Sequence, residues 1–126
     1  MQKQTKDFTV LVVDDEPLLT ETIANDFKRK GFNVYTASSG SSALKVIESH
    51  KVDLVVSDIR MPDGDGLSLL EGIRKTSPHI IVILMTGFTD YSEEDCLKKG
   101  AKCVLQKPFI QKQLRAKVFE YLNLTE

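Results

Sequence analysis

Apolar residues gather in five short runs along the chain, and a helical pattern follows each run. The runs cover residues 9–13, 32–37, 52–56, 80–85 and 103–105. The first and the fourth are almost continuous Val, Ile and Leu, without the alternation of a half-exposed strand. Such runs are typical of strands that are buried on both faces, as in a parallel sheet covered by helices.

Between these runs, apolar residues recur at helical spacing. Leu19, Ile23 and Phe27 lie four positions apart, after Pro17, which favours a helix start, and before Gly31, which favours a helix end. Similar stripes occur at Ala43, Leu44 and Ile47, at Leu67, Leu70 and Ile73, within 90–99, and at Ile110, Leu114, Val118 and Leu122. Strand–helix alternation, repeated five times, predicts a doubly wound α/β fold with a five-stranded parallel sheet.

Length and composition are those of one globular domain. We expect the 126 residues to form a single domain, with a core at about 8–122 and a polar N-terminal extension at 1–7. The net charge of -1 does not indicate binding to nucleic acid or to an anionic membrane. Cys96 and Cys103 lack metal-type spacing, so we expect two buried, reduced thiols and a cytoplasmic protein without a membrane span.

Polar residues follow four of the five predicted strands. Asp14 and Asp15 follow the first, Asp58 the third, Thr86 the fourth and Lys107 the fifth. Ligands of open α/β sheets bind beyond the carboxyl ends of the strands, so these side chains are expected to converge. Helix capping is an alternative for the first two acids, but it explains two adjacent aspartates less well than one.

The converging residues have the chemistry of phosphoryl transfer. Three carboxylates in one pocket repel each other unless a divalent cation such as Mg²⁺ lies between them. Lys107 is a point charge suited to a phosphoryl oxygen, although it could simply pair with one acid, and Thr86 could simply cap a strand end. Attack of Asp58 on phosphorus would give an acyl phosphate with a charge of about -2.

Four ordered groups of residues resemble the receiver domain of two-component response regulators, over nearly the whole chain. They are Val12-Val13-Asp14-Asp15-Glu16-Pro17, Asp58-Ile59-Arg60-Met61-Pro62-Asp63-Gly64-Asp65-Gly66-Leu67, Met85-Thr86-Gly87, and Gly100-Ala101 with Lys107-Pro108-Phe109. Each group alone is weak evidence, but all four in order at successive strand ends are specific. The resemblance implies a flavodoxin-like fold with strand order 2-1-3-4-5 and five helices.

The resemblance also implies a role for each site residue. Asp58 matches the phosphoacceptor. Asp15 and Asp58 match direct ligands of Mg²⁺ or Mn²⁺, Asp14 a ligand that acts largely through water, and Arg60 a backbone carbonyl ligand. Thr86 matches the hydroxyl that moves toward the phosphoryl group. Lys107 matches its ammonium partner and precedes Pro108 through a bond that is cis in this family.

Partners follow from the same resemblance. The phosphoryl group would come from a sensor histidine kinase, a phosphotransfer protein or a small donor such as acetyl phosphate. The region 90–122 would contact an output domain or a second copy in a homodimer. Direct binding to nucleic acid or to a membrane is not expected of this domain.

One position departs from the family pattern. Many receiver domains carry Tyr or Phe shortly after the Gly100-Ala101 pair, where this chain has Val104. Coupling is therefore expected to depend on Thr86 and the loop 87–91. Arg60 and Phe88 flank the phosphorylation site and are expected to influence the lifetime of the phosphoryl group.

Two alternative functions stay open. A phosphatase of the haloacid dehalogenase type also uses Asp, Lys and Mg²⁺, but it needs a second Asp two residues after the nucleophile, where this chain has Arg60. The other alternative is an interaction domain that never accepts phosphate. A nucleotide-binding domain is least favoured, because no glycine-rich loop follows the first strand. We expect a switch that catalyses only its own phosphorylation and dephosphorylation, rather than an enzyme.

Overall fold

Five parallel strands form the sheet at the centre of the molecule, in the order β2-β1-β3-β4-β5. The computed structural model describes residues 3–62, 65–87 and 92–126. The strands are β1 (Thr9–Val13), β2 (Asn33–Ala37), β3 (Leu54–Asp58), β4 (Ile81–Thr86) and β5 (Cys103–Gln106). The predicted doubly wound fold and its strand order are confirmed.

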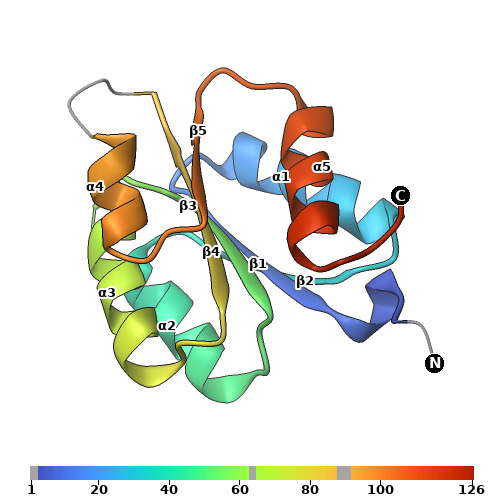
Figure 1. Cartoon of the computed structure of the whole chain (residues 1–126), viewed down its shortest axis with the longest axis horizontal. Helices are drawn as coiled ribbons and strands as arrows, with labels where there is room; N and C mark the ends of the chain where they lie inside the picture. Colours follow the sequence, from blue (N-terminus) through green and yellow to red (C-terminus); the bar gives the residue numbers. More distant parts are fainter. Residues whose placement is uncertain (1–2, 63–64, 88–91) are drawn as a thin grey trace.

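Helices cover both faces of this sheet. They are α1 (Pro17–Arg29), α2 (Gly40–Ser49), α3 (Gly66–Thr76), α4 (Glu93–Lys98) and α5 (Gln111–Tyr121). Figure 1 shows α1 and α5 on one face and α2, α3 and α4 on the other. None of the described helices is long and apolar enough to cross a membrane.

Alternate residues of each central strand enter opposite apolar layers. In β1, Val10 and Val12 belong to the layer under α1 and α5, whereas Leu11 and Val13 belong to the layer under the other three helices. All four side chains are fully buried. Because successive strand side chains point to opposite faces, burial on both faces requires the unbroken apolar run seen in the sequence.

The β3 strand begins two residues later than the apolar run predicted. Val52 is buried, but the strand starts at Leu54 and extends to Asp58. The residue between them, Asp53, accepts a hydrogen bond on its carboxylate from the Thr9 N–H, at 2.8 Å. Asp53 thus lies at the amino end of the sheet, and its carboxylate accepts the Thr9 N–H in place of a backbone carbonyl of the neighbouring strand.

Three further expectations need correction. Ile110 is not part of the buried stripe of α5, because it is the residue before the helix and its side chain is 62% exposed. Cys96 is buried as expected, but Cys103 is only half-buried. The polar N-terminal extension contains a short 3-10 helix, η1 (Thr5–Asp7), which the pattern did not predict.

Candidate functional site

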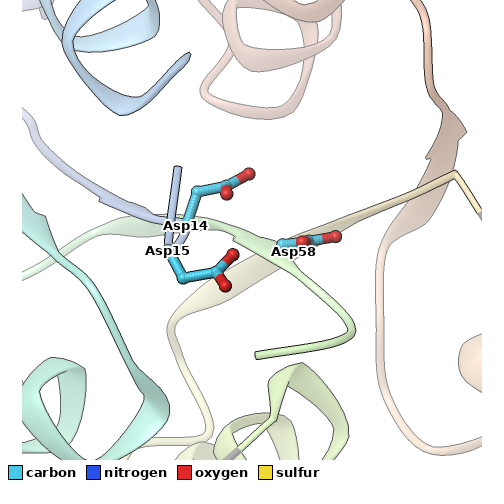
Figure 2. A group of neighbouring side chains, drawn as sticks. All are labelled: Asp14, Asp15 and Asp58. Carbon is cyan, nitrogen blue, oxygen red and sulfur yellow. The ribbon is translucent and has the colours of Figure 1, made fainter. Parts of the chain in front are cut away.

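Three aspartates meet at the carboxyl ends of β1 and β3. Each of Asp14, Asp15 and Asp58 has a carboxylate oxygen within 4.8 Å of one from the others. Figure 2 shows the three side chains together at the two neighbouring strand ends. The strand register explains the arrangement, because Val13 of β1 pairs with Ser57 of β3, and each of these two residues is followed by an aspartate.

The three acids differ in their exposure to water. Asp14 is 2% exposed and Asp58 is 6% exposed, whereas Asp15 is exposed. Backbone N–H groups hold the two buried carboxylates: Glu16 donates to Oδ1 of Asp14 at 2.9 Å, and Ile59 donates to Oδ1 of Asp58 at 3.0 Å. These bonds direct the other oxygen of each buried acid toward a common space.

Lys107 brings a positive charge to this space from the end of β5. Its Nζ lies 2.9 Å from Oδ2 of Asp14 and 3.5 Å from Oδ2 of Asp58. Glu16 contributes a third acidic contact at 3.7 Å. The Lys107–Pro108 bond is cis, as the resemblance to receiver domains implied, and the Lys107 N–H donates to the carbonyl of Thr86 at 2.7 Å.

Burial and charge shift the ionisation of both partners. Burial raises the pKa of Asp58 from its ordinary 3.8 to about 6, with Lys107 lowering it and Asp14 raising it. Burial lowers the pKa of Lys107, but the hydrogen bond to Asp14 and the nearby acid charges outweigh this and raise it above its ordinary value. Lys107 is therefore a permanent cation, and Asp58 resists ionisation more than an exposed aspartate does.

The donor set fits a hard divalent cation. Carboxylate oxygens at this spacing are the ligands that Mg²⁺ and Mn²⁺ prefer. Burial is the main cause of the raised pKa of Asp58, the charge of Asp14 raises it further, and a cation bound among the three acids would offset this repulsion. Asp14, Asp15 and Asp58 are thus the residues that would hold the metal.

Thr86 and Arg60 lie at or just after the carboxyl ends of two strands, β4 and β3. Thr86 is the last residue of β4 and is fully buried, one position beyond Met85, which pairs with Asp58. Arg60 is an exposed residue of the loop between β3 and α3. The moving hydroxyl of Thr86 and the metal-facing carbonyl of Arg60 stay predictions.

The aliphatic residue in place of the usual aromatic lies within β5. Val104 is half-buried, pairs with Leu84 and packs against the apolar layer beneath α2, α3 and α4. Phe88 and the rest of 88–91 lie outside the described residues, so the expectations for that loop stay predictions. Gly87, next to Thr86, is exposed, and a Cβ placed there would meet only ordinary contact with Lys107, at 3.8 Å.

Two contributors to the site were missed in the sequence. Glu16 reaches Lys107, although its place at a helix start suggested only a cap. Ser57 is fully buried, and its hydroxyl donates to the carbonyl of Asp58 at 2.9 Å. The available signal for Ser57 was a hydroxyl inside an otherwise apolar strand.

Comparisons with known proteins agree with this geometry. The family model described as the response regulator receiver domain matches residues 10–119. The sensor kinase CckA of Brucella abortus is 39% identical over 118 residues, which are 91% of this chain and 12% of that protein. The regulator PhoP of Bacillus subtilis, named for alkaline phosphatase synthesis, is 31% identical over 118 residues, 93% of this chain and 49% of that protein. The chain thus spans less than half the length of either relative.

A solved structure resembles this chain in fold as well as in sequence. The crystal structure of a CheX–CheY complex with beryllofluoride and magnesium, from Borrelia burgdorferi, superposes with a TM-score of 0.85 at 31% identity. The match covers 91% of this chain and 89% of that chain. The similarity therefore extends over almost the whole sheet and its helices.

Proposed function

The chain belongs to the response regulator receiver domain family, and we propose that it is a phosphorylation-dependent signalling switch whose phosphoacceptor is Asp58. The observation that carries the proposal is the meeting of three aspartates with Lys107 at one edge of the sheet. Phosphoryl transfer needs a nucleophile, compensation of charge and fixed positions, and these residues supply all three.

Asp58 is placed to act as the nucleophile. Its Oδ1 is held by the Ile59 N–H, which leaves Oδ2 toward Lys107. With a pKa of about 6, most copies carry the charged carboxylate at pH 7 and above. When bound by Asp14, Asp15 and Asp58, Mg²⁺ or Mn²⁺ would neutralise the acids and draw charge from the phosphoryl oxygens.

Lys107 compensates charge before and after transfer. In the resting protein its ammonium lies closest to Asp14 and second closest to Asp58. A phosphoryl group on Asp58 carries a charge of about -2 on three acceptor oxygens, which attract that ammonium and the hydroxyl of Thr86. Reorganisation of Thr86 and the loop 87–91 is the proposed start of the switch, since Val104 has no ring to rotate.

The proposal assigns partners by this chemistry. A sensor histidine kinase, a phosphotransfer protein or acetyl phosphate supplies the phosphoryl group, and the region 90–122 contacts an output domain or a second copy. We propose that residues 1–126 work as one cytoplasmic domain that contacts neither nucleic acid nor a membrane directly.

The alternatives make different predictions. A phosphatase of the haloacid dehalogenase type would turn over a phosphomonoester continuously, but Arg60 replaces the second acid that such an enzyme needs. An interaction domain would bind no beryllofluoride with Mg²⁺. The switch takes up one phosphoryl group and binds this phosphate mimic.

Intact-mass measurement tests the function directly. Incubation with acetyl phosphate and Mg²⁺ is expected to add one phosphoryl mass to the wild-type chain and none to Asp58→Asn. Asp95→Asn, which changes an exposed acid of α4, is the matched control and keeps the mass gain. A mass gain in Asp58→Asn equal to that of the wild type would remove Asp58 from its assigned role.

A further inference from the structure

Ser57 is a buried polar residue next to the phosphoacceptor. It is 0% exposed, it follows the fully buried Val55 and Val56, and its hydroxyl donates to the carbonyl oxygen of Asp58 at 2.9 Å. Burying a hydroxyl is unfavourable unless its hydrogen bond compensates for the lost water. The apolar pattern of the strand would be satisfied equally well by alanine, so the hydroxyl requires another explanation.

The same carbonyl is enclosed from a second side. Gly66 begins α3, and a Cβ placed there would overlap the Asp58 carbonyl oxygen and lie 3.0 Å from Cα of Ile59. The Gly66 N–H also donates to the Ile59 carbonyl at 2.7 Å. The start of α3 therefore lies directly against the Asp58–Ile59 peptide, and the Ser57 hydroxyl holds its oxygen.

The planarity of this peptide connects Ser57 to the reactive carboxylate. The Asp58 carbonyl and the Ile59 N–H belong to one rigid unit. The carbonyl accepts the bond from Ser57, and the N–H is shared between Oδ1 of Asp58 and the carbonyl of Met85 in β4, each at 3.0 Å. Rotation of the plane would therefore weaken these bonds together and change the direction of Oδ2, which lies 3.5 Å from Lys107.

We propose that Ser57 is a positioning residue that aligns Asp58 for attack on phosphorus, an inference that rests on the proposed function. In the transfer, an Asp58 carboxylate oxygen forms a bond to phosphorus. The bond between phosphorus and the donor oxygen breaks, and the donor leaves with that electron pair, as acetate when acetyl phosphate is used. Loss of the Ser57 hydroxyl leaves all reacting groups present but lowers the fraction that is aligned. Since small misplacements slow such reactions strongly, we expect a roughly five-fold to ten-fold slower transfer.

Kinetics of four proteins test this role: wild type, Ser57→Ala, Ser57→Thr and Val55→Ala. Initial rates over a range of acetyl phosphate concentrations, at fixed Mg²⁺, separate the maximal rate from the half-saturating concentration. Ser57→Ala is expected to lower the maximal rate roughly five-fold and to leave the half-saturating concentration unchanged. Ser57→Thr keeps the hydroxyl and recovers most of the rate. Val55→Ala destabilises the same strand and keeps the wild-type maximal rate.

A second measurement needs no phosphorylation. In metal-free protein, the NMR amide signal of Ile59 reports its hydrogen bonds to the Asp58 carboxylate and to the Met85 carbonyl, and therefore the orientation of the Asp58–Ile59 peptide. Ser57→Ala is expected to move this signal toward the position of a weaker bond and to speed its hydrogen exchange, whereas Val55→Ala leaves the position unchanged.

Any of four results would overturn the inference alone. Three are kinetic: a maximal rate in Ser57→Ala equal to that of the wild type, an equal loss of rate in Val55→Ala, or a folded Ser57→Thr that recovers no rate. The fourth is an unchanged Ile59 amide signal in Ser57→Ala. A wild-type chain that takes up no phosphoryl group would overturn the proposed function. This failure can be told apart from failure of the positioning role of Ser57, because the amide measurement does not depend on phosphoryl transfer.

Discussion

Two clusters that pair buried acids with half-buried bases are built differently: one joins α1 to α5, and the other lies at the carboxyl ends of the strands. Arg115 of α5 donates from Nη1 to both carboxylate oxygens of Asp26 in α1, each at 3.0 Å, and from Nε to Glu126 at 2.9 Å. At the opposite edge of the sheet, Lys107 lies against Asp14 and Asp58 with a single ammonium, at 2.9 and 3.5 Å.

The balance of charge distinguishes the clusters. Arg29 lies 3.8 Å from Asp26, so two cations accompany two acids there. Lys107 contacts three acids, and Asp15 of the triad adds a fourth carboxylate to this cluster. The first cluster is satisfied within the protein and holds α1 to α5. The second retains excess negative charge, which a bound cation or a proton on Asp58 relieves, and this difference separates a structural ion pair from a binding site.

The largest expected effect is loss of metal binding in Asp15→Asn. Removing one carboxylate charge takes away a preferred oxygen ligand of Mg²⁺, so we expect the dissociation constant for Mg²⁺ to be roughly 100-fold larger. Calorimetric titration is the suitable measurement, because the chain contains no tryptophan to report binding. Glu21→Gln, an exposed acid of α1, is the control and should bind as the wild type does. Equal affinity in Asp15→Asn would exclude a role in metal binding.

The second expected effect breaks the balanced cluster. Arg115→Ala leaves Asp26, which is 8% exposed, without its two-oxygen partner. An acid buried without such a partner is strongly unfavourable, so we expect the Tm to fall by about 5 °C. Thermal unfolding followed by circular dichroism measures it. Lys98→Ala removes an exposed pair with Glu94 and should change Tm by about 1 °C or less. Similar losses in both variants would show that burial of Asp26 is not the cause.

The third expected effect is a gain in folding stability, and it depends on pH. Because the folded pKa of Asp58 is raised from 3.8 to about 6, the folded state binds this proton more tightly than the unfolded state does. Stability therefore falls as pH rises from about 4 to 6 and stays lower above that. Metal-free Asp58→Asn should be more stable than the wild type by about 1 kcal/mol at pH 7.5, a value reduced from the full shift because solvent screens the charge.

Urea unfolding at pH 7.5 and pH 4 measures this difference. The gain should shrink toward zero at pH 4, and saturating Mg²⁺ should reverse it at pH 7.5 by stabilising the wild type preferentially. Greater stability of the wild type at pH 7.5 without metal would contradict the excess of negative charge at the site.

The smallest expected effect concerns the outer part of the balanced cluster. Glu126→Gln removes one charge-assisted contact of Arg115, at a carboxylate whose side chain is 40% exposed. We expect the Tm to fall by about 1 °C, since Asp26 keeps its partner. Comparison with Arg115→Ala by the same thermal unfolding assigns the stability to the inner pair. A loss as large as that of Arg115→Ala would assign it to the tail contact instead.

Local sequence patterns predicted a parallel sheet because each central strand needs apolar residues on both faces, whereas the strand order was implied by the resemblance to receiver domains. The limits of β3 were displaced, since Val52 is buried without belonging to the strand. The η1 helix was not predicted because no apolar stripe marks it. The Asp7 carboxylate accepts from the Gln4 N–H at 2.8 Å within the turn, and a contact from far along the chain adds to this, since the Thr5 hydroxyl donates to the Lys30 carbonyl at 2.7 Å.

The site was predictable as far as strand ends determine position. Asp14 and Asp58 meet because β1 and β3 are neighbours, and backbone topology alone gives this result. The pairing of Asp26 with Arg115 joins residues 89 positions apart through the long side chain of the arginine. Nothing in the local pattern of α1 or α5 identifies it, because an acid beside an apolar stripe is usually solvated.

Helix α5 also determines where attachments are tolerated. Its 11 residues, about 16 Å of helix, begin shortly after Lys107 and end beside η1. Lys3, Thr5, Leu124 and Glu126 line one shallow cavity, and Figure 1 places both termini on that side of the molecule. A fluorophore, surface tether or fused protein joined at either terminus would therefore start opposite Asp58, leaving the acidic edge free for a phosphodonor.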